Sequence, residues 1–288
     1  MYKQIDSNKR KSLALMILFV LVIAGMVWAW AQYSEGGYYM IIPATIFATG
    51  MSAMSFFAGD KIALSTAGAK EIKKNDNPYL WRMVENLSIT AGLSMPKVHI
   101  IEDSSMNAFA TGRDPAHSSI AVTTGLLKNL KNEELEGVIA HELSHVKNYD
   151  IRLMMVVIVC VGIITLLADW MMRSFIFRGR DDNNKGNILM IVGIVLAVLS
   201  PLFAKLIQMA VSRKREFLAD ASASLLTRYP EGLASALEKI SSQNIPLKRA
   251  NKATAHLYIS SPFKGKGISK LFSTHPPAQE RIKALRNM

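Results

Sequence analysis

The residues best suited to chemistry lie in the run His141-Glu142-Leu143-Ser144-His145. On a helix, two histidines four residues apart project from the same face, so both imidazoles can bind one metal ion. Zn²⁺ suits two neutral nitrogen ligands with one position left open, and Glu142 would lie beside a zinc-activated water as general base. An amphipathic helix with two surface histidines would show the same pattern. A third ligand elsewhere in the chain must decide between the two interpretations.

The residues before the histidines predict the helix that this geometry requires. Asn132 is a suitable N-cap, and the two glutamates that follow it place negative charge at the positive end of the helix dipole. Leu135, Ile139 and Leu143 recur every four residues. One stripe of the helix is therefore expected to pack on a core while the histidines project from the adjoining face.

A second helical segment, Glu216-Phe217-Leu218-Ala219-Asp220, has two acids on one face. Glu216 can supply an oxygen ligand to zinc, and Asp220 can hydrogen-bond the free ring nitrogen of a ligand histidine and fix its tautomer. Alternatively, the two acids offset the three basic residues at 213–215 in a helical charge ladder.

Four long apolar runs separate these segments from one another and from the N-terminus. Half of the 288 residues are hydrophobic, which is high for a soluble protein. The excess lies in Ser12–Ala31, Tyr38–Ala58, Leu153–Met172 and Ile188–Ala210. Each run has about the 20 residues that a helix needs to cross a bilayer. The sequence therefore predicts a polytopic membrane protein.

Basic residues flank these runs and account for the net charge of +12. No nucleic-acid-binding module is recognisable, so a nucleic acid partner is not expected. Three basic residues at 9–11 precede the first run, and the connection to the second carries no Lys or Arg. The positive-inside rule then places the segment 59–150 in the cytoplasm. This arrangement exports the weakly basic loop 173–187. The more strongly basic residues at 213–215 must then outweigh the charge of the loop and stay in the cytoplasm.

The polar segment between the two apolar pairs predicts helix and strand. Residues 67–91 have helical spacing, and residues 96–101 alternate as a short strand. Residues 107–112 and 119–123 predict two antiparallel strands around a turn. His99 in the first strand is expected to be half-buried, and His117 in the turn to be solvated. The single cysteine, Cys160, excludes an internal disulfide and a cysteine-based zinc site.

Taken together, the motifs resemble the HtpX family of membrane-embedded zinc metalloproteases, relatives of the CAAX prenyl-protein proteases in the gluzincin class. The resemblance rests on a hydrophobic hairpin before each half and on four motifs. These are Asn107-Ala108-Phe109-Ala110, the helix with the two histidines, Glu216 to Asp220, and Ser273-Thr274-His275-Pro276-Pro277 before Glu280-Arg281-Ile282.

This resemblance implies an α+β membrane protein, mainly helical, with four transmembrane helices and a gluzincin-type zinc protease domain that contains a small antiparallel sheet. Residues 1–58 would form the N-terminal transmembrane hairpin and residues 153–210 the second one. The protease domain would consist of two parts, residues 59–152 with the two histidines and residues 211–288 with the third ligand.

The implied activity is that of a zinc-dependent endopeptidase with one zinc per chain. The ligands would be His141, His145 and Glu216, with Glu142 as general base and Asp220 behind a ligand histidine. A substrate strand would pair with the edge formed by Asn107, Ala108, Phe109 and Ala110. His275 would help to hold the oxyanion. Alternatively, His275 is a turn residue before two prolines.

The resemblance further implies polypeptide substrates, above all misfolded or damaged membrane proteins cleaved during quality control and stress. The chain would lie in the cell inner membrane as a multi-pass protein with its catalytic domain in the cytoplasm, and its oligomeric state stays open. A membrane scaffold or chaperone with a vestigial metal site is one alternative, but the intact ligand set and Glu142 argue against it. A prenyl-protein processing protease is another, and it would need more apolar spans to enclose a chamber.

Overall fold

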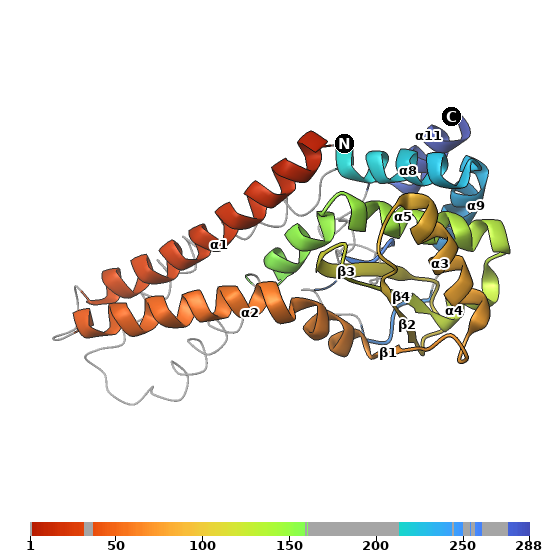
Figure 1. Cartoon of the computed structure of the whole chain (residues 1–288). Helices are drawn as coiled ribbons and strands as arrows, with labels where there is room; N and C mark the ends of the chain where they lie inside the picture. The colour runs from red at the N-terminus through yellow and green to blue at the C-terminus, as the bar shows by residue number, and fades with distance from the viewer. Residues whose placement is uncertain are drawn as a thin grey trace.

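A hairpin of two long helices extends from a body of sheet and helices in the computed structural model (Figure 1). The structure describes residues 2–31, 37–158, 160, 213–243, 245–249, 254, 257–260 and 276–288. Helix α1 spans Tyr2–Ala31 and packs along α2, Ile41–Ala67, which the short 3-10 helix η1, Gly37–Met40, precedes. The two N-terminal helices therefore pack as a hairpin, and its transmembrane character stays a prediction.

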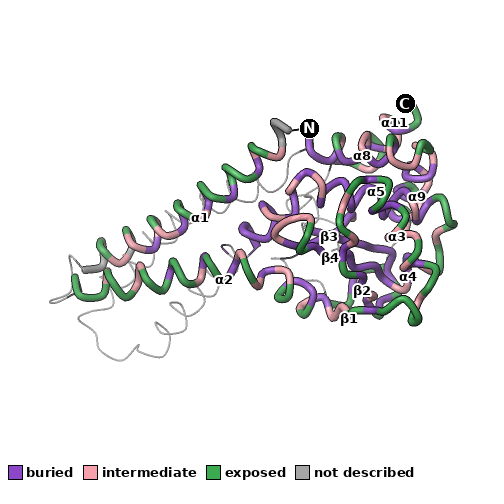
Figure 2. Tube along the Cα trace, in the orientation of Figure 1, coloured by how far each residue is buried: buried purple, intermediate pink, exposed green. Residues whose placement is uncertain are grey.

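Many residues along this hairpin are exposed (Figure 2). Leu13, Leu21, Ile42, Phe47 and Phe57 are all exposed, and exposed apolar surface of this extent marks contact with a membrane or a partner. Among the described residues, one helix, Tyr38–Ala67, is long and apolar enough to cross a bilayer. Most of the third and fourth predicted spans lies outside the described residues, so four transmembrane helices remain a prediction.

Four strands form a mixed sheet rather than the predicted antiparallel one. They are β1, Ala69–Glu71; β2, Lys97–Ile101; β3, Ala108–Asp114; and β4, His117–Thr123. Their order is β1-β2-β4-β3, with β2 and β4 parallel and the other pairs antiparallel. The hairpin of β3 and β4 was predicted correctly. Strand β4 lies between β2 and β3, and because the tight turn after β3 reverses the chain, β4 runs in the same direction as β2 and pairs with it in parallel.

Besides α2, which packs on one face of the sheet, further helices cover the other face and extend the body beyond it. They are α3, Pro78–Ala91; α4, Thr124–Asn129; α5, Asn132–Lys147; α8, Arg213–Thr227; α9, Pro230–Ser242; and α11, Ala278–Arg286. A further helical stretch at residues 150–158 follows α5. The helix predicted over residues 67–91 is wrong in its first half, because Gly68 ends α2 in a left-handed conformation and β1 follows. The helix begins instead after Asn77, whose Oδ1 accepts from the Leu80 N–H.

Helix α5 lies at the centre of the body and contacts α3, α8, α9 and β3. Leu135, Ile139 and Leu143 belong to the same buried apolar cluster, as their spacing predicted. Close packing against α9 depends on small residues. A Cβ atom added to Gly137 would lie 2.7 Å from the backbone N of Leu233, so any larger residue would force the two helices apart.

Candidate active site

The N-terminus of α5 differs from the predicted cap by one residue. Lys131 is the N-cap, and its backbone N–H donates to the Glu134 carboxylate at 2.7 Å. Asn132 is the first helical residue instead, and its Oδ1 accepts from the Tyr79 hydroxyl at 2.8 Å. The helix itself forms as predicted, and it carries His141, Glu142 and His145 into the interior.

Helix α8 brings Glu216 to the two histidines of α5. His141 Nε2 lies 3.2 Å from His145 Nε2, and the Glu216 oxygens lie 3.8 Å and 3.7 Å from these two atoms. All three residues are buried, and their candidate ligand atoms lie within 4.8 Å of one another. Ligand atoms bound tetrahedrally to zinc at 2.0–2.1 Å are separated by about 3.3 Å. The three side chains therefore need only a small contraction to bind one ion.

Two buried carboxylates orient the rings of the histidine pair. His141 Nδ1 lies 3.0 Å from Asp220 Oδ1, and His145 Nδ1 lies 3.0 Å from Asp150 Oδ2. Because an ionised carboxylate only accepts hydrogen bonds, both Nδ1 atoms donate. The two Nε2 atoms then face each other across 3.2 Å, where a proton or a metal cation must lie between them. This arrangement fits a metal site.

The pKa values of the two histidines diverge in the protein without a bound cation. Burial lowers the pKa of His141 to about 4, although the hydrogen bond to Asp220 opposes this effect. Burial also acts to lower the pKa of His145, but the hydrogen bond to Asp150 and the nearby carboxylates outweigh it and raise the pKa to about 9. At neutral pH the pair thus holds one proton, which a metal ion would displace.

Arg281 supports the same site from α11, close to the C-terminus. Its Nε and Nη2 donate to the two oxygens of Asp220 at 2.8 Å and 2.6 Å, and its Nη1 lies 3.4 Å from Glu216 Oε2. Burial acts to raise the pKa of Asp220, but Arg281 outweighs this effect and holds the pKa at about 2. Sequence reasoning assigned Arg281 no role, because nothing in its local sequence indicates contact with residues 61 or more positions away.

Asp150 is the second residue that sequence reasoning missed. It lies five residues after His145 and close to α8, where Arg215 Nη1 is 3.5 Å from its Oδ1. An acid shortly after the helix of the two histidines was visible in the sequence as a candidate partner. A turn separates His145 from Asp150, so helical spacing could not show that the Asp150 carboxylate points back toward the His145 ring.

The buried charges around the site are unequal in number. Four acids, Glu142, Asp150, Glu216 and Asp220, lie with two guanidinium groups, Arg215 and Arg281, and every one of these side chains belongs to a buried residue. With neutral histidines this leaves two formal negative charges in a region of low dielectric constant. A divalent cation would neutralise them, so the charge balance agrees with the ligand geometry.

Comparison with known proteins agrees with this geometry. Residues 74–288 match peptidase family M48. The chain belongs to peptidase family M48. A protease HtpX homolog from Dictyoglomus turgidum is 47% identical over 287 residues, which cover 100% of this chain and 94% of the relative. A protease HtpX homolog from Lactobacillus helveticus is 45% identical over 301 residues, which cover both chains completely. The chain is thus a membrane-associated metalloprotease, as its motifs predicted.

A solved structure shares the fold of this M48 peptidase. The crystal structure of Ste24p from S. mikatae superposes with a TM-score of 0.52 at 21% sequence identity. The match covers 99% of this chain and 66% of the longer Ste24p chain. At this identity the likeness concerns the fold alone and gives no substrate class.

The predicted substrate strand of the M48 peptidase lies at the edge of the sheet, in β3. The Thr123 N–H donates to Asn107 O, so Asn107 faces β4 and the backbone groups of Ala108 face away from the sheet. Part of this outer edge is already used, because Ile259 N–H donates to Ala108 O at 3.0 Å and Asn107 Nδ2 donates to Ser260 O at 3.0 Å. Whether a substrate pairs here stays a prediction.

The remaining histidines lie away from the metal ligands or outside the description. His99 is buried rather than half-buried as predicted, since β2 lies inside the sheet between β1 and β4. His117 is exposed as predicted, and its Nδ1 lies 2.8 Å from Asp114 Oδ1. His275 lies outside the described residues, so its role stays a prediction.

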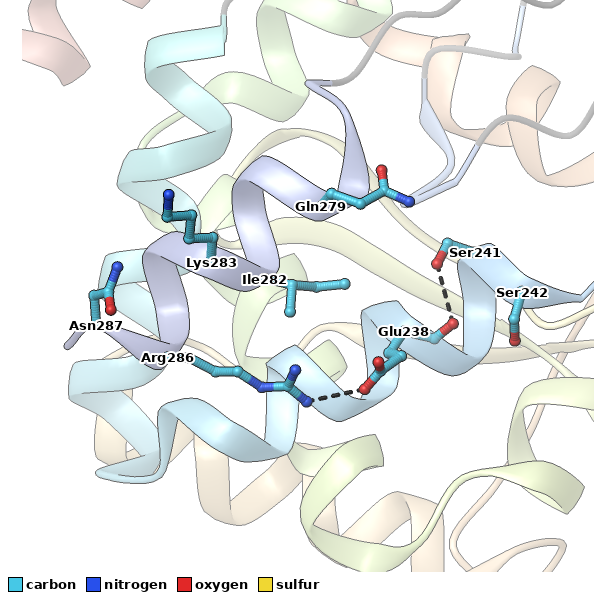
Figure 3. A pocket seen from close by; sticks show the side chains of 8 residues that line it. All are labelled: Glu238, Ser241, Ser242, Gln279, Ile282, Lys283, Arg286 and Asn287. Carbon is cyan, nitrogen blue, oxygen red and sulfur yellow. Dashed lines mark hydrogen bonds and ion pairs between the residues drawn. The ribbon is translucent and has the colours of Figure 1, made fainter.

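A cleft of about 600 Å³ is lined by residues of α9 and α11 (Figure 3). At its rim Arg286 donates to Glu238 at 2.9 Å and to Glu231 at 3.0 Å. Its lining includes none of the candidate ligands. The cleft is therefore separate from the metal site, and these ion pairs help to hold α11 on α9.

Proposed function

We propose that this M48 peptidase is a zinc-dependent endopeptidase with one zinc bound by His141, His145 and Glu216. One observation carries the proposal. Both Nδ1 atoms of the histidine pair are committed to buried carboxylates, while both Nε2 atoms and the Glu216 oxygens converge within 4 Å. Two imidazoles and one carboxylate, with a fourth position left for water, form a common ligand set of catalytic zinc.

The chemistry divides between the metal and Glu142. When bound, zinc polarises the scissile carbonyl and lowers the pKa of a water molecule. Glu142 follows His141 on the same helix and is buried beside the ligands. Its carboxylate accepts a proton from the attacking water and delivers it to the leaving nitrogen. Asp220 and Asp150 hold the two imidazoles in the tautomer that binds metal.

The substrates in this proposal are extended polypeptides of misfolded or damaged membrane proteins. Binding along the outer edge of β3, chiefly at Ala110, relies on backbone hydrogen bonds and therefore tolerates many sequences. His275 stabilises the oxyanion. The position of β3 at the edge of the sheet, next to the helix that carries two of the candidate ligands, supports substrate binding along β3.

The membrane arrangement is also part of the proposal. The chain crosses the cell membrane four times, with the catalytic body in the cytoplasm. The basic residues at 9–11 precede the first span and those at 213–215 follow the fourth, so four crossings place both groups on the cytoplasmic side that basic residues favour. The ligand-bearing helices α5 and α8 then meet on one side of the bilayer.

Proteolysis by the full-length protein in detergent tests this function. Degradation of an unfolded protein is expected to require zinc, to stop with a chelator and to return when zinc is added. Glu142→Gln should lower the rate by at least about 100-fold while zinc remains bound. Glu133→Gln is the matched control, because it makes the same change at an exposed position of α5. Chelator-resistant cleavage would contradict the proposal.

A further inference from the structure

The polar end of the membrane helix α1 reaches the turn behind the metal site. Asn8 is fully buried, although it lies only eight residues from the N-terminus. Its Nδ2 donates to Asp150 Oδ1 at 2.7 Å and to the carbonyl oxygen of Asn148 at 2.9 Å. Figure 1 shows this end of α1 beside the start of α8. A residue of the membrane hairpin thus contacts the turn that follows the two histidines.

Asp150 connects this contact to the metal ligand His145. Its Oδ2 accepts from His145 Nδ1 at 3.0 Å, while its Oδ1 accepts from Asn8 and faces Arg215. A carboxylate rotates easily about its last side-chain bond, because that torsion has broad minima. A donor fixed on Oδ1 therefore holds Oδ2 toward the histidine.

The turn itself needs support, because Tyr149 adopts a left-handed conformation with φ of 60°. This conformation is uncommon for a residue other than glycine and persists where the surroundings enforce it. The Asn8 amide holds the carbonyl of the preceding residue, and the Lys9 ammonium lies 4.5 Å from the centre of the Tyr149 ring. Two neighbouring residues of α1 thus contact the strained turn.

We propose that Asn8 is a positioning residue of the metal site, acting through Asp150 on His145. Helix α1 then supports the metal site, because its contact with the turn fixes the orientation of His145 through Asp150. The inference rests on the proposed metal site. Loss of a partner that orients a ligand histidine typically weakens metal affinity by about 10 to 100 fold.

The matched variants are Asn8→Ala and Ser12→Ala in the full-length protein in detergent. Both residues are buried on α1, one turn apart, but among the described residues the Ser12 hydroxyl donates to the carbonyl of Asn8 in the same helix and to no group of the turn. Titration with Co²⁺, followed by its visible absorption bands, reports both affinity and ligand geometry without relying on proteolysis. Asn8→Ala should weaken Co²⁺ binding by about tenfold or more and shift the bands, and Ser12→Ala should do neither.

A double-mutant cycle that combines Asn8→Ala with Asp150→Asn tests whether Asn8 influences metal affinity through Asp150. If Asn8 acts through Asp150, Asn8→Ala should cost little further Co²⁺ affinity when Asp150→Asn is already present. If the alanine variant does not fold, Asn8→Leu, which fills a similar volume without a donor or a charge, replaces it and is expected to show the same loss. Wild-type affinity and absorption bands in the Asn8 variant, or losses that add fully, would overturn the role of Asn8. Absence of histidine-dependent Co²⁺ binding in the wild type would instead overturn the proposed metal site.

Discussion

Arg281 and Asp220 form a bidentate ion pair beside the metal site, with Nε and Nη2 of the guanidinium 2.8 Å and 2.6 Å from the two carboxylate oxygens. Both side chains are buried, and the pair joins the last helix of the chain, α11, to α8. Asp220 in turn accepts from His141 Nδ1. The C-terminal helix thus fixes the acid that orients His141, a proposed metal ligand.

Replacement of Arg281 by alanine is expected to destabilise the protein and the metal site together. Breaking a buried ion pair leaves an uncompensated charge, which costs about 3–5 kcal/mol of the free energy of unfolding. Denaturant unfolding and metal analysis of the detergent-solubilised protein measure the two effects. Lys283→Ala, at an exposed position of the same helix, is the control and should change neither. Unchanged stability of the Arg281 variant would show that Asp220 is balanced by another group.

Local periodicity explains why the centre of this site could be predicted from the sequence. Two histidines on one helix, or Glu216 and Asp220 on another, share a face because of helical geometry alone. Arg281 and Asn8 could not be assigned, because each reaches the site through packing between elements distant in the chain, whereas Asp150 was missed because a turn separates it from His145.

The same distinction applies to the fold. The hairpin of β3 and β4 was predictable because its pairing is local, whereas the parallel pairing of β2 with β4 depends on how a later strand inserts into the sheet. The start of α3 was a missed local signal. Asn77 and Pro78 form a common helix start that the continuous apolar spacing concealed.

Metal affinity should rise with pH through the neutral range. The pKa of His145 is raised to about 9 in the protein without metal, so below that pH the imidazole is protonated and must lose its proton to bind. The apparent affinity for zinc is therefore expected to increase by about tenfold per pH unit between pH 6 and pH 8. Asp220, with a pKa of about 2, stays ionised across this range and adds no further dependence.

Competition titrations with a zinc-binding dye at several pH values measure this slope. Asp150→Asn removes one of the negative charges that raise the pKa of His145, although its amide oxygen can still accept from Nδ1, so its slope should be shallower and its limiting affinity weaker. A wild-type affinity independent of pH would mean that His145 is neutral without metal.

Gly137→Ala should destabilise the protein because the new methyl group would lie 2.7 Å from the backbone N of Leu233. Overpacking of this kind costs about 1–3 kcal/mol of the free energy of unfolding. Gly50→Ala in α2 is the control, since its Cβ would meet nothing within 4 Å. Thermal unfolding of both variants in one detergent compares them. Equal stability of the two would show that α5 and α9 separate without cost.

Zinc content of Glu216→Ala, measured beside the wild type and Glu142→Gln, tests the metal site most directly. The wild type and Glu142→Gln should each retain close to one zinc per chain, because in the proposed mechanism Glu142 transfers protons and is not a metal ligand. Glu216→Ala should lose most of its zinc, because only the two imidazoles of α5 remain as ligands. Equal zinc in the wild type and Glu216→Ala, or loss of zinc from Glu142→Gln, would contradict the assignment of His141, His145 and Glu216 as the ligand set.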